Sequence, residues 1–237
     1  MEDLLLQASD WEFVWSNRQL LAKGTLVTVT LTIASVLLGF AVGFPAGAIE
    51  VYGRGRVRDA VSSVGVLFRG TPIVVIVVVF YFGIPLPRLG EIPLVDIPMR
   101  AFISATLALG LRSAAYQSQV FRGTIQSVEA GQYEAGRAIG LTSTQAIRHV
   151  VVPQALRRSV PGFQNEFTIV LKDTSVVIAI GLAELLTRGW RLFTQPGREG
   201  AVFEVIVAIS IIYFVLTFVT NRGLDLASAR FAIPEGD

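Results

Sequence analysis

Between Thr25 and Ile49 the chain carries no charged side chain, and this apolar stretch is long enough to cross a lipid bilayer. Because hydrocarbon offers the backbone no hydrogen-bond partner, a segment of this kind must be helical. The whole chain shares this character: 52% of its 237 residues are hydrophobic, 16% are charged, and the mean hydropathy is +0.60. An average soluble domain has about 25% charged residues. The sequence therefore predicts an all-α integral membrane protein.

Five apolar segments are predicted to be transmembrane helices, which leaves little chain for a separate soluble domain. They cover residues 25–49, 60–82, 99–120, 163–186 and 201–220. Glycines and Pro45 near the end of the first segment predict a kink or a close contact with another helix. The second segment is interrupted by Arg69-Gly70-Thr71-Pro72, which predicts a bend or a break.

The distribution of arginine and lysine predicts the orientation of these spans. An odd number of spans places the termini on opposite sides, and the side richer in basic residues is the cytoplasmic one. The N-terminal segment 1–23 is then extracytoplasmic, the transmembrane domain covers 24–222, the polar stretch 122–162 is cytoplasmic, and so is the tail 223–237. No basic residue precedes Arg18, so a cleaved signal peptide is not predicted.

The polar stretch 122–162 predicts two short helices joined by a tight turn. The first covers Glu134–Gly140 and ends at its glycine. Thr142 and Gln145 form the pattern of a capping box, which begins a second helix, and Pro153 is predicted to end it. From the residues alone two interpretations stay open: a loop that docks into another protein, or an amphipathic loop on the membrane surface.

The same stretch resembles the EAA loop of binding-protein-dependent importer permeases. The matching residues are Glu134, Ala135, Gly136, Gly140, Val150, Val152 and Pro153. Gly136 stands where the family pattern has a second alanine, and the two valines stand where it has isoleucine and leucine. By this resemblance, Glu134 and Gly140 would seat the loop in a groove of a partner ATPase.

Further motifs between residues 24 and 189 resemble the polar-amino-acid branch of these permeases. They are Phe68-Arg69-Gly70-Thr71-Pro72, Phe121-Arg122-Gly123, Gly131-Gln132, Pro153-Gln154-Ala155-Leu156-Arg157-Arg158, Asn165-Glu166-Phe167 and Leu171-Lys172-Asp173-Thr174-Ser175. The resemblance implies a type I ABC importer permease (MetI-like) fold in the cytoplasmic membrane, in contact with lipid. It also implies a second permease subunit, identical or different, two cytoplasmic ABC ATPase subunits and an extracytoplasmic amino-acid-binding protein.

The residues predict no catalytic or metal site in this chain. It has no GxxxxGK[ST] phosphate loop, no cysteine, and a single histidine, His149. We therefore expect a transport subunit and not an enzyme, with no cofactor of its own and with ATP and magnesium bound by the partner ATPase. The formal charge of +2 gives no reason to expect a nucleic-acid partner.

Polar residues inside the predicted spans are candidates for a substrate path. They are Arg112, Tyr116, Gln119, Asn165, Glu166 and Asp173. An ionisable group at the centre of a bilayer costs about 2.5–3.5 kcal/mol or more. Two interpretations of that cost stay open and are compatible: the charges neutralise one another, or two helix faces line a translocation path.

One departure from the family pattern concerns the substrate. Relatives often have asparagine at the position of Arg112 and glutamate at that of Gln119, so this face loses a negative group and gains a positive one. The substrate is then predicted to be an acidic or neutral polar amino acid. The alternatives are a permease of the same architecture for an opine or a compatible solute, and a membrane scaffold that does not transport. The polar intramembrane residues argue against a scaffold, and the docking loop argues against a channel.

Overall fold

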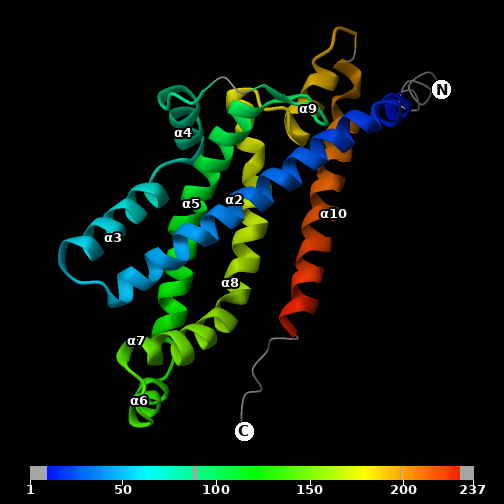
Figure 1. Cartoon of the computed structure of the whole chain (residues 1–237). Coiled ribbons are helices and arrows are strands. Elements are labelled where there is room, and N and C mark those ends of the chain that lie inside the picture. Colours follow the sequence, from blue (N-terminus) through cyan, green and yellow to red (C-terminus); the bar gives the residue numbers. More distant parts are fainter. Residues whose placement is uncertain (1–9, 88–89, 198, 230–237) are drawn as a thin grey trace. The chain divides into compact units, whose positions relative to one another are not determined.

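The computed structural model describes residues 10–87, 90–197 and 199–229, which are mostly helical (Figure 1). The chain divides into two compact units. The first takes the described parts of 1–35, 72–109 and 170–220, and the second those of 36–71, 110–169 and 221–237. Four helices contribute residues to both units: α2 (Arg18–Tyr52), α5 (Met99–Gln126), α8 (Val152–Asp173) and α10 (Val202–Ala229).

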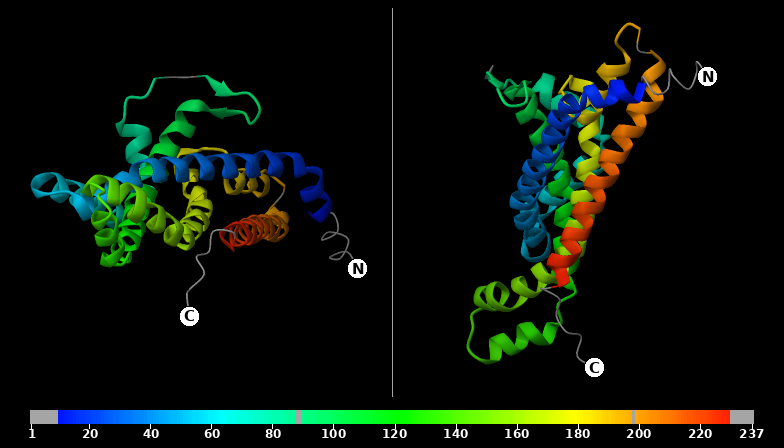
Figure 2. Two further views of the ribbon diagram at one scale, coloured as in Figure 1. Left: turned by 60° about the horizontal axis from the view of Figure 1, so that its bottom comes forward. Right: turned by 90° about the vertical axis from the view of Figure 1, so that its right-hand side faces the viewer.

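The first unit contains most of the short elements. These are α4 (Ile73–Val78), the π-helical segment η1 (Val79–Gly83), the strands β1 (Glu91–Ile92) and β2 (Ile97–Pro98), the 3₁₀ segments η3 (Thr174–Ile180) and η4 (Glu199–Ala201), and α9 (Leu185–Phe193). The antiparallel pair β1–β2 loops out between η1 and α5 (Figure 2). At the tip of this hairpin, Asp96 accepts a hydrogen bond of 2.8 Å from Lys23, which lowers the pKa of its carboxyl group.

A buried carboxylate connects three helices of the first unit. Glu184 is 0% exposed, and it caps α9 by accepting hydrogen bonds from the backbone of Leu186 (2.9 Å) and Thr187 (2.7 Å). It also accepts hydrogen bonds from Thr28 of α2 (3.4 Å) and from Tyr213 of α10 (3.0 Å). A charge at an apolar helix junction is tolerated because these donors replace water. Sequence reasoning gave Glu184 no role.

The second unit contains α3 (Gly55–Gly70), α6 (Ala130–Ala138), α7 (Ser143–Ala146) and the π-helical segment η2 (Ile147–Val151). Its helices α2 and α5 approach closely along three glycines spaced four apart, which lie on one helix face. An added Cβ would lie 2.4 Å from the Gln117 amide nitrogen at Gly39, 2.7 Å from the Ala114 oxygen at Gly43, and 2.7 Å from the Ser118 oxygen at Gly47. The close helix contact predicted from these glycines is confirmed.

Predicted spans and observed helices agree in part. The segments 25–49 and 99–120 lie within α2 and α5. The segment 201–220 begins at the last residue of η4 and otherwise lies within α10. The predicted break in the second segment is confirmed, because α3 and the α4–η1 pair are bent by 106° on either side of Thr71-Pro72. The segment 163–186 is not one helix, which corrects the prediction. There, α8 gives way to η3 at Thr174, and Gly181 ends the helical path with a positive φ of 72°.

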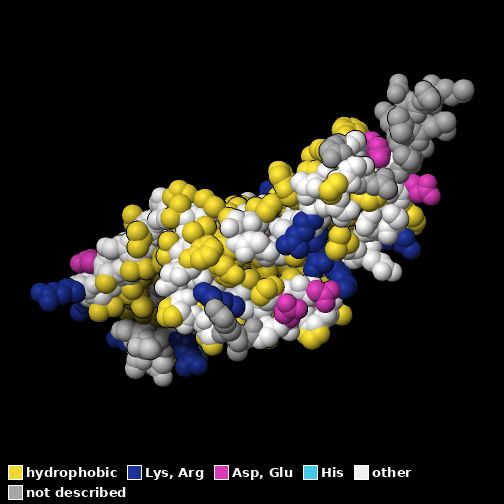
Figure 3. All heavy atoms as spheres, turned by 90° about the horizontal axis from the view of Figure 1, so that it is seen from above, with side chains coloured by type: hydrophobic (Ala, Val, Ile, Leu, Met, Phe, Trp, Pro, Cys, Tyr) yellow, Lys and Arg dark blue, Asp and Glu magenta, His cyan; other side chains and the backbone are white. Residues whose placement is uncertain are grey.

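Length and hydropathy identify membrane crossings directly for only part of the described chain. The helices Arg18–Tyr52 and Val202–Leu226 qualify, with mean hydropathies of 2.2 and 2.6, and the bent pair would be a third crossing. The count of five spans stays a prediction. Apolar side chains cover much of the face seen in Figure 3. Helix α10 has many exposed apolar side chains along its length, which include Phe203, Ile206, Ile211, Phe214, Val215, Phe218 and Val219. Contiguous exposed apolar surface of this kind is suited to lipid.

Replacing Gly43 with alanine should loosen the contact between α2 and α5. The new methyl group would overlap the Ala114 carbonyl oxygen, and overpacking of this kind costs about 2 kcal/mol. We expect a lower midpoint of thermal unfolding in detergent. The matched control is Gly123→Ala in α5, where an added Cβ meets nothing within 4 Å. An equal fall in both variants would contradict the packing argument.

Replacing Glu184 with alanine should destabilise the first unit by about 3 kcal/mol, because Thr28, Thr187 and Tyr213 lose a buried acceptor. The same thermal measurement checks this. Glu184→Gln should lose less, because one side-chain oxygen remains. Glu91→Ala, which removes an exposed carboxylate from β1, should leave the midpoint unchanged. A stable Glu184→Ala variant would show that the carboxylate is dispensable.

Candidate functional site

The connection between α5 and α8 folds into two short helices around a glycine turn. Gly140 has a φ of 94°, a conformation that favours glycine, and it ends α6 as predicted. The backbone nitrogen of Leu141 donates to the Gly136 oxygen over 3.2 Å, which closes the turn. The capping box is also confirmed. The Gln145 backbone donates to the Thr142 hydroxyl (3.3 Å), and the Thr142 backbone donates to the Gln145 side chain (2.8 Å).

Packing holds the turn against the helices that carry it. Gly136 is buried, and an added Cβ would meet Val150 at 3.3 Å and Ala146 at 3.4 Å. A small apolar cluster of Ile125, Val151 and Ala155 lies beneath, with Tyr133 of α6 packed on it. Glycine at the position of the family's second alanine therefore lets α6 lie close to the second helix.

Pro153 does not end the second helix, which corrects the prediction. Helical structure runs without a break from Ser143 through the π-helical segment η2 into α8, and Pro153 is the second residue of α8. A proline lacks an N–H and its ring crowds the preceding turn of a regular α-helix. The π-helical segment η2 ends two residues before Pro153, so its wider turn can accommodate the ring, and such turns often occur at functional sites.

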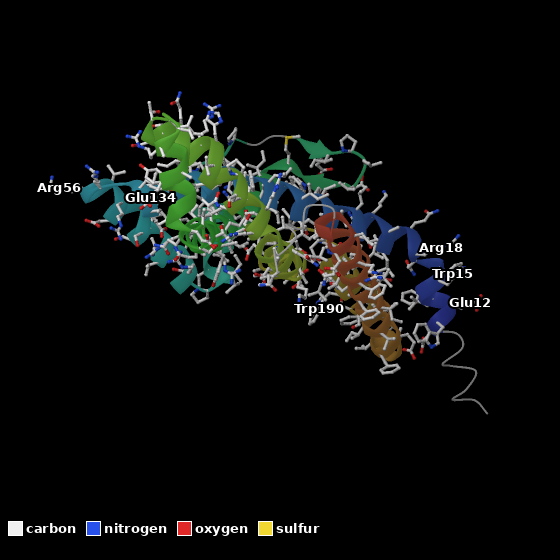
Figure 4. The ribbon with its side chains drawn as sticks, turned by 90° about the horizontal axis from the view of Figure 1, so that it is seen from below. Glu12, Trp15, Arg18, Arg56, Glu134 and Trp190 are labelled. Atoms are coloured by element: carbon white, nitrogen blue, oxygen red, sulfur yellow. The ribbon has the colours of Figure 1, made fainter. Side chains whose placement is uncertain are left out.

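The outer surface of α6 and its turn is exposed. Glu134, Ala135 and Arg137 are all exposed, and Ile139, beside the turn glycine, is 81% exposed. Figure 4 shows Glu134 on α6. A well-ordered turn that presents a carboxylate and an uncovered isoleucine is suited to contact another protein. Ile139 was not among the predicted site residues, although its place between the helix and Gly140 could have identified it.

The polar residues of α5 find partners inside the second unit. The Arg112 guanidinium lies 5.1 Å from the centre of the Tyr116 ring, a cation–π contact. The Gln119 amide donates to the Glu50 carboxylate over 2.8 Å. Glu50 is 3% exposed, and Arg122 also reaches it at 3.4 Å. Sequence reasoning missed Glu50, although its position directly after the charge-free stretch 25–49 was a signal.

The remaining predicted path residues are divided between the two units. Asn165 and Glu166 of α8 lie in the second unit, where Asn165 is exposed and Glu166 is only 4% exposed. Asp173, the last residue of α8, lies in the first unit. The role of these residues in a substrate path stays a prediction.

The described residues contain no group of three or more His, Cys, Asp or Glu side chains arranged to hold a metal ion. The exposed loop surface and the polar residues of the long helices stay the candidate functional features.

Comparison with known proteins gives the family. Residues 35–232 match the family described as binding-protein-dependent transport system inner membrane component. The glutamine transport system permease protein GlnP of Escherichia coli (strain K12) is 33% identical over 225 residues, which is 94% of this chain and 98% of that protein. The octopine transport system permease protein OccQ of Rhizobium meliloti is 31% identical over 221 residues, 91% of each chain.

A solved structure agrees with these relatives. The crystal structure of an amino acid ABC transporter with histidines contains a chain that matches with a TM-score of 0.78 and 29% identity, covering 92% of this chain and 96% of that one. The likeness spans nearly the full length in sequence and in fold, and the loop described above lies within the matched residues. The chain therefore belongs to the inner membrane components of binding-protein-dependent transport systems.

Proposed function

We propose that this chain is the permease subunit of an ATP-driven ABC importer that carries a polar amino acid across the cytoplasmic membrane. The observation that carries the proposal is the α6–Gly140–α7 turn, which presents Glu134 and Ile139 to solvent in a chain of this family. Burial of Ile139 against a partner would remove its apolar surface from water and so favour docking at this turn. We infer that the partner is a cytoplasmic ATPase, since this chain has no phosphate loop of its own.

The coupling route proposed here is mechanical. Arg158 of α8 donates to the backbone oxygen of Ser127, and Gln154 of α8 donates to Gln132 of α6 over 3.4 Å. These bonds hold the loop to the foot of α8, and α7, η2 and α8 form one uninterrupted helical path. When the ATPase subunits close, their push on α6 would move α8, which carries Glu166 within its buried face. That displacement is the step we expect to switch the permease between its two access states.

The substrate class follows from charge and from the relatives. The names of the relatives refer to glutamine and to octopine, both of which carry an amino-acid head group. The positive charge of Arg112 on α5 would disfavour a cationic substrate and tolerate a neutral or acidic one. We therefore infer a neutral or acidic polar amino acid, with an opine as the second candidate. A scaffold without transport is less favoured because it has no need for buried Glu50 and Glu166.

The full assembly would contain a second permease subunit, two ATPase subunits and an extracytoplasmic amino-acid-binding protein. ATP and magnesium would bind to the ATPase subunits. The predicted orientation places the α6 loop in the cytoplasm, on the side where the ATPase subunits would dock, and the N-terminus outside.

Reversing the charge of Glu134, or placing a charge at Ile139, should weaken the stimulation of ATP hydrolysis by substrate. We expect Glu134→Lys and Ile139→Asp each to reduce substrate-stimulated ATPase activity in proteoliposomes about tenfold, which corresponds to about 1.4 kcal/mol of lost coupling. Wild type and variants are co-expressed with the candidate ATPase and binding protein, and hydrolysis is measured with and without amino acid. Asp59→Lys makes the same charge change at an exposed position of α3 and should have no effect.

Assembly must be followed in the same samples. If the ATPase copurifies with every variant and stimulation persists in both loop variants, the coupling role is wrong. If no ATPase associates with the wild-type chain, the importer assignment itself fails and the scaffold alternative gains weight.

Removing the charge of Arg112 should broaden selectivity. The wild-type complex should take up glutamine or glutamate faster than arginine. In Arg112→Asn the ratio of these uptake rates should fall about tenfold, equivalent to about 1.4 kcal/mol. Uptake into proteoliposomes with the three labelled amino acids checks this, with Arg54→Asn at an exposed position as the control. Arginine as the best substrate of the wild type would overturn the proposed class.

A further inference from the structure

A groove in the first unit runs between the N-terminal residues and α10. Its volume is about 520 Å³. The residues that line it are Trp11, Val14, Trp15, Arg18, Leu21, Ala22, Thr25, Ala208, Ile211 and Ile212. Apart from Arg18 and Thr25, these side chains are hydrophobic. Nothing in the transport mechanism uses this groove.

One side of the groove has the chemistry of a membrane–water interface. Trp15 is 70% exposed and Trp11 is 44% exposed. The Arg18 guanidinium lies 5.1 Å from the centre of the Trp15 ring and donates to the Trp15 carbonyl over 3.0 Å. Figure 4 shows Glu12, Trp15 and Arg18 on the N-terminal stretch, and of the two charged residues only Arg18 lines the groove. Tryptophan with arginine is the residue combination enriched where head groups meet hydrocarbon.

The other side of the groove is hydrocarbon-like. It consists of Ala208, Ile211 and Ile212 of α10, whose mean hydropathy of 2.6 is the higher of the two long helices that qualify as membrane crossings. The third tryptophan of the chain, Trp190, lies near the same level of α10. The preceding residue, Gly189, contacts α10 so closely that an added Cβ would lie 2.0 Å from the Ile209 side chain. All three tryptophans therefore gather around one stretch of α10, as in an aromatic belt.

We propose that this groove binds one anionic phospholipid. The acyl chain lies against Ala22, Ala208 and Ile212, and the head-group phosphate pairs with Arg18. Guanidinium matches phosphate geometry and charge, and no carboxylate among the described residues pairs with Arg18. Lipid is favoured over a second copy of this chain because a protein contact would have to bury the Arg18 charge, whereas a phospholipid neutralises it and leaves it at the interface.

The test uses the fluorescence of a single tryptophan. Trp11→Phe/Trp190→Phe leaves Trp15 as the reporter in the full-length chain, purified and reconstituted in phosphatidylcholine nanodiscs. Brominated phosphatidylglycerol or brominated phosphatidylcholine is then added at increasing mole fractions. We expect the anionic lipid to quench Trp15 with saturation, at a mole fraction about tenfold lower than the zwitterionic lipid requires.

Two variants identify the groups responsible. Arg18→Gln should abolish the preference for the anionic lipid, whereas Arg191→Gln, an exposed arginine of α9 outside the groove, should keep it. Ala22→Phe should fill the groove and weaken quenching by both lipids. Equal quenching by the two lipids in the parent, or a preference that survives Arg18→Gln, would overturn the proposal. Absence of quenching by either lipid would also overturn it and would show that protein covers Trp15, with a second copy of the chain as the first candidate.

Discussion

The carboxylate of Glu184 is surrounded by donors from α2, α9 and α10, and the geometry of the first unit depends on it. Because it caps α9, it also places Arg188, which donates to the backbone oxygens of Ala183 and Val95 and so ties the β1–β2 hairpin to α9. An isolated buried charge would be very costly, and several simultaneous hydrogen bonds remove that cost. The same bonds require each helix to present its donor at one level, so a single carboxylate specifies how the helix ends fit together.

The second unit also has a buried carboxylate, Glu50, that is held by donors from another helix. Glu50 ends the long apolar part of α2, and Ser118, Gln119 and Arg122 of α5 all point at it. The glycines Gly39 to Gly47 bring the two helix backbones close enough for these bonds to form. In an apolar setting close packing and polar pairing are therefore not independent, because the first creates the distances that the second needs.

Local chemistry explains which parts of this architecture were predictable. The break at Thr71-Pro72, the end of α6 at Gly140 and the Thr142–Gln145 capping box each depend on a few neighbouring residues, and the structure contains all three. The continuous helix over 163–186 was wrong because apolar character alone does not distinguish an α-helix from the 3₁₀ turn that follows α8. Glu50 and Glu184 were missed because their partners are distant in the sequence. Thr28 and Glu184, for example, are 156 residues apart.

The position of Pro153 inside a continuous helical path has a consequence for the proposed coupling. A proline that ended the helix would separate the α6 loop from α8 by a flexible joint, and a push on the loop would be lost in that joint. Instead η2 absorbs the proline, and the helical path continues from Ser143 to Asp173 through both units. The loop is fixed at its other side by the α5 end, where Arg158 bonds to Ser127. The loop is continuous with α8 and exposes Glu134, Ala135, Arg137 and Ile139, so it has the two properties that the proposed coupling element needs: a rigid connection and a free contact surface.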